Sequence, residues 1–327
     1  MTLEFSRRTL PFQTDFQIAG TRCFLSTNSP EVLQAAAQLR SPTDQNGNRA
    51  FEMEIIVDRA LDQAPERLAY FRGLGHIVFA MVPPRSFVVY DLLRKRVHAV
   101  LSTAATLDHS FWNKLLLPIT IGVLGTTVGV APIHSACLER QGCGLLIAGV
   151  SGAGKSTLTA ALAQLGFALI SDDWTYISTA QRGLVAHGLS APVKLLPDAA
   201  RFFPELHGLA PRTAFNGELA YEIEPKASAL GFAVKSASHP RWIFLLERTS
   251  TAGCHFVPCR PEYVRDFFER SGERLPDELT EAKAFRSRVI RNLACCPAWI
   301  VRTGENPQKT ARAVDAFLEE AEHAAAV

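Results

Sequence analysis

Residues 149–157 read Gly-Val-Ser-Gly-Ala-Gly-Lys-Ser-Thr and match the phosphate-binding pattern G-x-x-x-x-G-K-[ST]. In this pattern the glycines allow backbone N–H groups to turn toward a triphosphate. The lysine, Lys155 here, reaches the β- and γ-phosphates, and the hydroxyl of Ser156 binds Mg²⁺. The other residues predicted to line the phosphate site are Gly149, Ser151, Gly152, Ala153, Gly154 and Thr157.

The residues around this loop predict the elements that must position it. The apolar run 144–148 predicts a buried strand that leads into the loop. Residues 157–165 are rich in Ala and Leu and are followed by Gly166, which predicts a helix. Residues 167–170 predict a second buried strand that ends in Ser-Asp-Asp. This order places acids beside the phosphates at the carboxyl ends of strands, which disfavours the alternative of a glycine turn without a nucleotide.

The two acids, Asp172 and Asp173, are candidate catalytic residues. Phosphoryl transfer needs fixed positive charge, a metal, and an acceptor for the proton of the attacking hydroxyl. Adjacent side chains of a strand point to opposite faces, so we expect one acid to act as the base and the other to order Mg²⁺. The alternative for one of them is that it only caps the following turn.

Bulk properties exclude several classes of function. The chain has 327 residues, of which 47% are hydrophobic and 20% charged, and this is typical of a soluble protein with one large or two ordinary domains. Its net charge of +2 gives no general attraction to nucleic acid. The seven cysteines form no C-x-x-C pair, and the N-terminus lacks an apolar signal core. We therefore expect reduced thiols and a cytoplasmic protein.

Patterning along the chain predicts three regions. Residues 1–108 alternate as short strands with one helix that begins at Pro30, and they predict an accessory α/β domain for dimerisation, partner binding or packing. Residues 109–133 predict an apolar helical connector. Because Pro118 and several glycines interrupt it, we expect a buried helix and no membrane span. Residues 134–327 predict the catalytic domain, with a core strand at 241–246 and helices over 261–270, over 277–294 and from Pro307.

At this point the chain resembles the HPr kinase/phosphorylase family, whose catalytic core is similar to that of phosphoenolpyruvate carboxykinase. The resemblance is carried by the loop at 149–156, by Leu-Ile-Ser-Asp-Asp at 169–173, and by His134 in the strand before the loop. It implies an α/β fold in which an N-terminal α/β domain precedes a P-loop catalytic domain of this type. It also implies ATP and Mg²⁺ as cofactors, a serine of a small protein as phosphate acceptor, and a multi-subunit assembly. In this family the acid pair serves as base and metal partner, which suggests Asp172 as the base and Asp173, with Ser156, as metal ligands.

Two departures from the family pattern limit what is implied. Residues 183–193 contain neither acid nor arginine, whereas the family carries a Glu/Arg-rich signature there that is linked to the reverse, phosphorolytic reaction. Thr157 stands where those enzymes commonly have an acid. The chain therefore looks like an outlying relative of the kind found beside peptide-modifying gene clusters, and HPr itself need not be its substrate.

The favoured hypothesis is an ATP-dependent kinase for a Ser/Thr hydroxyl of a protein or peptide. A small-molecule hydroxyl kinase and a nucleotide-binding regulatory ATPase remain as alternatives. His134 is either a catalytic contact or a hydrogen-bonded core histidine. Four further side chains are candidates for phosphate or substrate contacts: Lys194, Arg212, Glu218 and Arg241.

Overall fold

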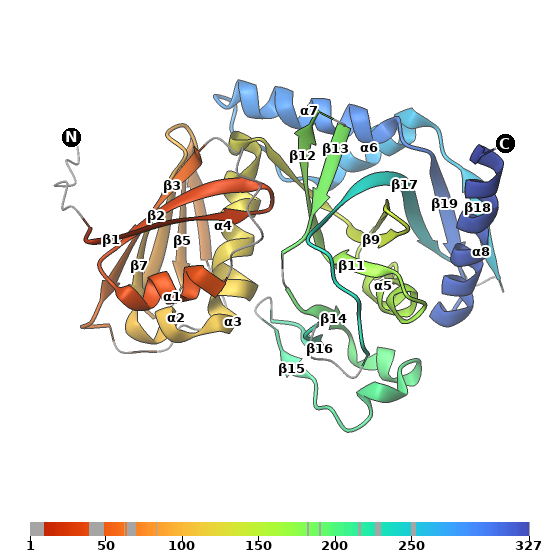
Figure 1. Cartoon of the computed structure of the whole chain (residues 1–327), viewed down its shortest axis with the longest axis horizontal. Helices are drawn as coiled ribbons and strands as arrows, with labels where there is room; N and C mark the ends of the chain where they lie inside the picture. Colours follow the sequence, from red (N-terminus) through yellow and green to blue (C-terminus); the bar gives the residue numbers. More distant parts are fainter. Residues whose placement is uncertain are drawn as a thin grey trace. The chain divides into compact units, whose positions relative to one another are not determined.

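The computed structural model shows a mixed α/β protein with several sheets (Figure 1). It describes residues 10–38, 49–61, 63, 70–82, 84–181, 183–189, 191–214, 217–225, 230–249 and 253–326. The chain divides into two compact units. Unit 1 comprises residues 1–128 with 276–279, and unit 2 comprises 129–275 with 280–327. The division at 128/129 falls between the predicted boundaries at 108 and 133.

Unit 1 is built on one seven-stranded sheet with the strand order β1-β2-β3-β7-β6-β5-β4. Its strands are β1 (Phe12–Ile18), β2 (Thr21–Thr27), β3 (Arg49–Asp58), β4 (Tyr70–Leu74), β5 (Ile77–Val82), β6 (Ser86–Asp91) and β7 (Arg96–Ser102). The helix α1 (Pro30–Gln38) begins at the predicted proline. Alternate residues of β3, such as Met53 and Ile55, are buried, as expected of a strand whose one face packs on helices.

The rest of unit 1 is a helical segment that ends earlier than the sequence predicts. It contains α2 (Thr103–Leu107), α3 (His109–Phe111), a π-helical turn over Trp112–Leu116, α4 (Leu117–Leu124) and a 3₁₀ turn over Gly125–Val128. Residues 130–133, which we expected to complete a helical connector, instead lie in strand β8 (Val130–His134). Pro132 explains the difference, because proline lacks the N–H group that a helix interior requires.

By length and composition alone, the stretch His109–Val128 is apolar enough to cross a membrane. Within this stretch, 56% of the most apolar window is buried inside the structure. The core helix of a soluble protein meets the same criteria of length and hydropathy, so they are weak support for a membrane span.

Unit 2 contains a nine-stranded mixed sheet with the path β11-β9-β10-β17-β13-β12-β8, and β19 joins it through β17 and β18. A second, three-stranded sheet has the order β14-β16-β15. The remaining strands of the large sheet are β9 (Ala136–Arg140), β10 (Cys143–Gly149), β11 (Ala168–Ser171), β12 (Trp174–Ala180), β13 (Gly183–His187), β17 (Ala237–Arg248), β18 (Cys254–Pro258) and β19 (Ala298–Thr303). The small sheet consists of β14 (Val193–Leu195), β15 (Arg212–Thr213) and β16 (Leu219–Ile223).

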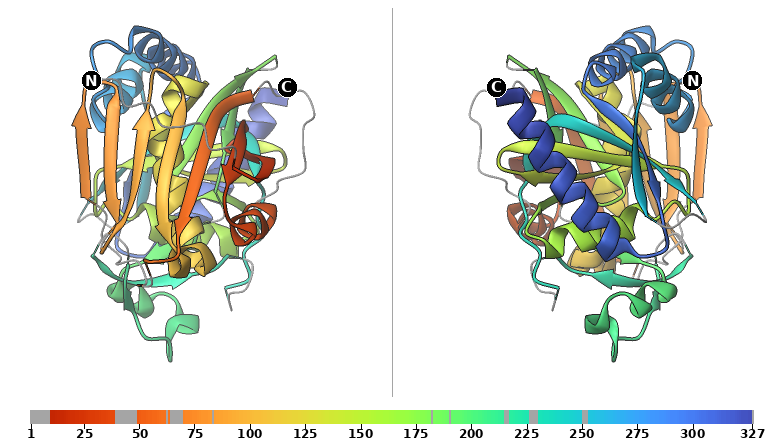
Figure 2. Two further views of the ribbon diagram at one scale, coloured as in Figure 1. Left: turned by 90° about the vertical axis from the view of Figure 1, so that its left-hand side faces the viewer. Right: turned by 90° about the vertical axis from the view of Figure 1, so that its right-hand side faces the viewer.

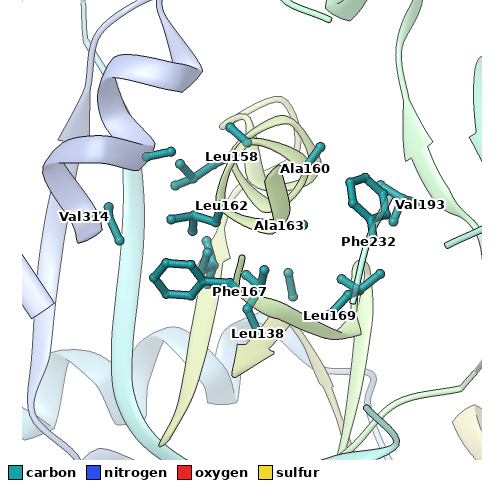
Figure 3. Packing of buried hydrophobic residues seen from close by; sticks show 14 of the residues in the cluster. Leu138, Leu158, Ala160, Leu162, Ala163, Phe167, Leu169, Val193, Phe232 and Val314 are labelled. Carbon is teal, nitrogen blue, oxygen red and sulfur yellow. The ribbon is translucent and has the colours of Figure 1, made fainter. Parts of the chain in front are cut away.

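Helices cover both faces of the large sheet. One apolar cluster packs α5 (Lys155–Gln164) and α8 (Pro307–Ala326) against one face, with Leu158, Leu162 and Val314 at its centre (Figure 3). Figure 2 shows α8 lying across the strands on this side. A second cluster packs α6 (Pro261–Ser271) and α7 (Thr280–Ala294) against the other face. Two 3₁₀ turns, Pro197–Arg201 and Pro204–Leu206, complete unit 2.

The direction of three neighbouring strands brings the predicted loop and the predicted acids together. β9 pairs antiparallel with β10 on one side and antiparallel with β11 on the other. Two antiparallel steps restore the direction, so β10 and β11 run the same way and their carboxyl ends meet at the same edge of the sheet. The loop follows β10 and the acids follow β11, at this edge.

A glycine outside the loop fixes the end of β11. A Cβ atom at Gly188 would overlap the backbone carbonyl of Ile170, which lies two residues before Asp172. The N–H group of Gly188 donates to the carbonyl of Ser236 at 3.0 Å, so its backbone is held in this position. Only glycine permits two backbones to approach this closely.

We therefore expect Gly188→Ala to displace the end of β11 and to lower the free energy of unfolding by roughly 1–3 kcal/mol. Chemical denaturation of the variant measures this change. Gly122→Ala in α4 is the matched control, because apart from its chain neighbours and its own helix backbone no atom of the described residues lies within 4 Å of its Cβ position. That control is expected to be neutral or to stabilise by about 0.5–1 kcal/mol, as for any glycine in a helix. Equal behaviour of the two variants would contradict the proposed steric role of Gly188.

Candidate functional site

The loop between β10 and α5 contains two glycines with positive φ angles and leads directly into a helix. Gly152 and Gly154 have φ angles of 79° and 93°, a region that side chains other than glycine rarely adopt. Gly154 occupies the position before the first residue of α5, and as a glycine it has no side chain that could cap the helix. The first N–H groups of a helix have no intrahelical acceptor and carry partial positive charge. The start of α5 therefore offers backbone donors to a phosphate.

Lys155 is the first residue of α5 and its side chain is buried. Its Nζ donates a hydrogen bond to the carbonyl oxygen of Gly149 at 3.1 Å. Burial lowers the pKa of Lys155, while the charges of Asp173 and Asp172 act in the opposite direction. The ammonium group thus lies within electrostatic reach of both acids, as the sequence predicts.

Asp172 is a buried carboxyl group held at one oxygen only. Its Oδ2 accepts a hydrogen bond from the backbone N–H of Lys194 at 3.1 Å, and in the described part of the chain Oδ1 has no hydrogen-bond partner. Burial raises the pKa of Asp172 to about 7, against the lowering effects of the Lys194 N–H, Ser156 and Lys155. Such a carboxyl group can accept a proton near neutral pH.

Asp173 differs from its neighbour in both exposure and charge. Its side chain is 53% exposed, and Oδ1 lies 3.1 Å from Nε2 of His134. Burial alone would raise the pKa of Asp173, but His134, Lys194 and Lys155 together hold it below its usual value. The two acids follow β11 in a bend, so the alternation between faces that we expected of strand residues does not apply to them.

The ring of His134 is fixed by the pairing of β8 with β12. In this register His134 lies opposite Trp174, and the two rings stack with their centroids 5.2 Å apart. His134 therefore contacts Asp173 on one side and an aromatic ring on the other. Whether His134 also contacts a phosphate or substrate stays a prediction.

The structure adds Trp174 to the site, brings the candidate Lys194 into it, and places the candidate Arg241 away from it. Trp174 was not predicted, although its position directly after the acids was a signal. Lys194 was a candidate, and β14 brings its N–H group to Asp172 and its charge near Asp173. Arg241, another candidate, instead lies 3.7 Å from the sulfur of Cys143, at the opposite end of β10 from the loop.

The last two candidates come from the small sheet. Arg212 is exposed in β15, and Glu218 directly precedes β16. Among the described residues, no group of three or more His, Cys, Asp or Glu side chains is arranged to hold a metal ion.

Comparison with known proteins finds similarity only among solved structures. No family model matches the chain, and no curated protein matches it. Among solved structures, the Hpr(Ser) kinase/phosphatase from Coxiella burnetii aligns with 15% sequence identity and a TM-score of 0.34. The alignment covers 59% of this chain and 99% of that chain. The likeness is weak, so any function proposed for this chain depends on the residues of the site.

The pKa values of the two acids are shifted in opposite directions, so we expect opposite changes in Tm when each acid is replaced by asparagine. At low pH the carboxyl group of Asp172 is neutral in both the folded and the unfolded chain, so it does not affect stability. As the pH rises toward about 7, this carboxyl group ionises in the unfolded chain before it does so in the folded chain. The folded state therefore loses stability over this range. Asp172→Asn should therefore raise Tm relative to the parent at pH 8, and this gain should shrink at pH 4–5. Thermal unfolding at several pH values measures it.

Asp173→Asn is the matched control, because the pKa of Asp173 is lowered and its carboxylate stabilises the folded state above the unfolded pKa. This variant should unfold at a lower Tm at neutral pH, with a deficit that shrinks as the pH falls. A lower Tm for Asp172→Asn at pH 8 would show that Asp172 is not a destabilising buried charge.

Proposed function

We propose that this protein is an ATP-dependent kinase that transfers the γ-phosphate to a serine or threonine hydroxyl of a protein or peptide. The observation that supports this most directly is the environment of Asp172. Its carboxyl group is buried and interacts with Ser156 and Lys155, the two residues that the loop pattern assigns to metal and phosphate. A proton acceptor beside a phosphate-binding lysine is the arrangement that phosphoryl transfer to a hydroxyl requires.

The residues of the loop fit a nucleoside triphosphate and Mg²⁺. The N–H groups around Gly152 and Gly154, Lys155 and Thr157 would bind the phosphates, and Ser156 and Asp173 would hold the metal. Oxygen donors such as these are what Mg²⁺ prefers. The buried Oδ1 of Asp172 has no hydrogen-bond partner in the described structure, so it is left to accept a hydrogen bond from the acceptor hydroxyl. When bound, these cofactors supply the phosphoryl group and neutralise its charge.

Each residue of the site then has a distinct role. Asp172 accepts the proton of the acceptor hydroxyl at its carboxylate, and the N–H of Lys194 holds that carboxylate in place. Lys155 provides fixed positive charge against the transferred group. His134 orients Asp173 through the contact at 3.1 Å.

We propose a protein or peptide as the phosphate acceptor because of the resemblance to the HPr kinase/phosphorylase family. The positions at which this chain differs from the family pattern limit what else is proposed. Residues 183–187 form β13, and the stretch 183–193 contains no acid or arginine, so we do not propose the phosphorolytic reaction. All seven cysteines are free, which fits the cytoplasmic location that we propose.

The direct test is incubation of the protein with Mg²⁺, ATP and candidate peptides chosen from neighbouring genes. A mass increase of one phosphate on a Ser or Thr of the peptide supports the proposal. Free serine and sugars in parallel reactions test for a small-molecule kinase. ATP hydrolysis without any phosphorylated product would instead support a regulatory ATPase and would contradict the kinase proposal.

Two substitutions separate binding from transfer. Lys155→Ala should abolish transfer and weaken nucleotide binding, because it removes the charge that contacts the phosphates. Asp172→Asn should lower kcat by about 10²–10⁴-fold while the Kd for Mg–ATP changes little, because a general base acts mainly in the transition state. Asp198→Asn, which changes a side chain that is 63% exposed in a 3₁₀ turn, is a neutral control. Near-normal transfer by Asp172→Asn would exclude Asp172 as the base.

The raised pKa of Asp172 also predicts the pH dependence of transfer. A base must be deprotonated to act, so kcat/KM should rise with pH through about 7 and then level off. Initial rates between pH 5.5 and 9 measure this profile. In Asp172→Asn the residual rate should lose this rise, and a profile that keeps it would assign the ionisation to another group.

A further inference from the structure

The two acids of the candidate site lie in a short bend whose ends are tied to each other. The bend follows Ser171, the last residue of β11, and leads into β12, whose second residue is Thr175. The hydroxyl oxygens of Ser171 and Thr175 lie 2.7 Å apart, within hydrogen-bond distance. Oγ1 of Thr175 also donates a hydrogen bond at 2.7 Å to the carbonyl oxygen of Ser135, between β8 and β9. We call these three groups the hydroxyl clamp.

The carbonyl group of Ser135 fixes the direction of both hydrogen bonds in the clamp. A carbonyl oxygen can only accept, so the single hydroxyl proton of Thr175 points toward Ser135. The hydroxyl group of Ser171 must then donate to Oγ1 of Thr175. Thr175 therefore accepts one hydrogen bond and donates the other, and hydrogen bonds that are linked in this way strengthen each other.

The hydroxyl clamp is shielded from water. Thr175 and Ser135 are fully buried, and Ser171 is buried as well. If the hydroxyl group of Thr175 were removed, the carbonyl of Ser135 and the hydroxyl of Ser171 would each lose a partner that water cannot replace. The bend would then have to move for these groups to find new partners. The position of the bend therefore depends on the hydroxyl group of Thr175.

Both ends of the hydroxyl clamp adjoin residues of the candidate site. Ser171 directly precedes Asp172, and Ser135 directly follows His134, which contacts Asp173. The contacts of the two acids with other segments hold their carboxyl groups. The clamp holds the backbone on either side of the acids, so it acts on both of them together.

We propose that Thr175 is a positioning residue, which through the hydroxyl clamp sets where both acids lie relative to Lys155. The part that the acids play in phosphate transfer rests on the proposed function, whereas the position of the bend does not. A displacement of about 1 Å in a reacting group can lower a rate by about 10²-fold. A hydroxyl group that touches no substrate can therefore still control transfer.

The test compares variants that remove or keep this hydroxyl group. Thr175→Val removes it with little change in volume, and Thr175→Ser keeps it. Thr159→Val is the matched control, because Thr159 is also fully buried and its Oγ1 has no hydrogen-bond partner among the described residues. Circular dichroism should show that these variants are folded. If Thr175→Val does not fold, Ser171→Ala opens the clamp at its other hydrogen bond and takes its place.

The position of the bend is measured by fluorine NMR, which needs no activity. The chain contains four tryptophans, and Trp174 lies between Asp173 and Thr175. In protein labelled with fluorotryptophan, Trp174→Phe identifies the resonance of this residue. The resonance should shift in Thr175→Val and keep the position of the parent in Thr175→Ser and Thr159→Val. A loss of stability alone would not shift a resonance of the folded state. An unshifted resonance in Thr175→Val, or an equal shift in Thr175→Ser, would overturn the proposal.

Phosphate transfer measures the consequence of a displaced bend. In Thr175→Val, kcat should fall by about 10–100-fold while the Kd for Mg–ATP changes little, because the phosphate-binding loop is unaltered. Thr175→Ser should recover most of the loss, and Thr159→Val should keep the kcat of the parent. A parent that transfers no phosphate contradicts the proposed function, and the fluorine measurement then decides whether the clamp positions the bend. An active parent with an unchanged kcat in Thr175→Val contradicts the positioning role alone.

Discussion

The burial of a carboxyl group beside the start of α5 is the constraint on which the candidate site depends. Removing an acid from water disfavours its charged form, and this raises the pKa of Asp172 to about 7. Burial acts on Lys155 in the opposite sense and lowers its pKa. The lysine retains its charge partly because Asp173 stays ionised nearby. The three groups are thus electrostatically coupled, so that a change at any of them alters the protonation of the others.

The acids keep these positions because segments that are distant in the sequence hold them in place. The N–H of Lys194 in β14 binds one oxygen of Asp172, and Gly188 lets the backbone after β13 approach the end of β11. His134 reaches Asp173 from β8, at the far end of the strand path from β11. The residues that position the acids therefore come from three segments that are separated in the sequence. Lys194 and His134 contact the acids themselves, and Gly188 contacts the strand that precedes them.

The sequence predicted the local parts of the site well and the long-range parts poorly. The strand predicted over 144–148, the helix over 157–165 and the strand over 167–170 follow from patterns within a few residues. The structure has β10, α5 and β11 at these places, with bounds that differ by one or two residues. The insertion of β9 between β10 and β11, and the contact of Lys194 with Asp172, depend on pairings between segments that no local pattern encodes. The prediction of helix over residues 130–133 was wrong, because it followed the apolar composition and gave too little weight to Pro132. These residues lie in β8.

The charged groups of the candidate site gather at one edge of the large sheet of unit 2. The charges of Asp173 and Asp172 counteract the effect of burial on the pKa of Lys155, and His134, Lys194 and Lys155 lower the pKa of Asp173. Charges that are concentrated in this way suit the binding of a small, highly charged ligand. The proposal that unit 2 binds a nucleotide therefore rests on how these groups act on one another, and it fails if replacing one of them leaves the protonation of the others unchanged.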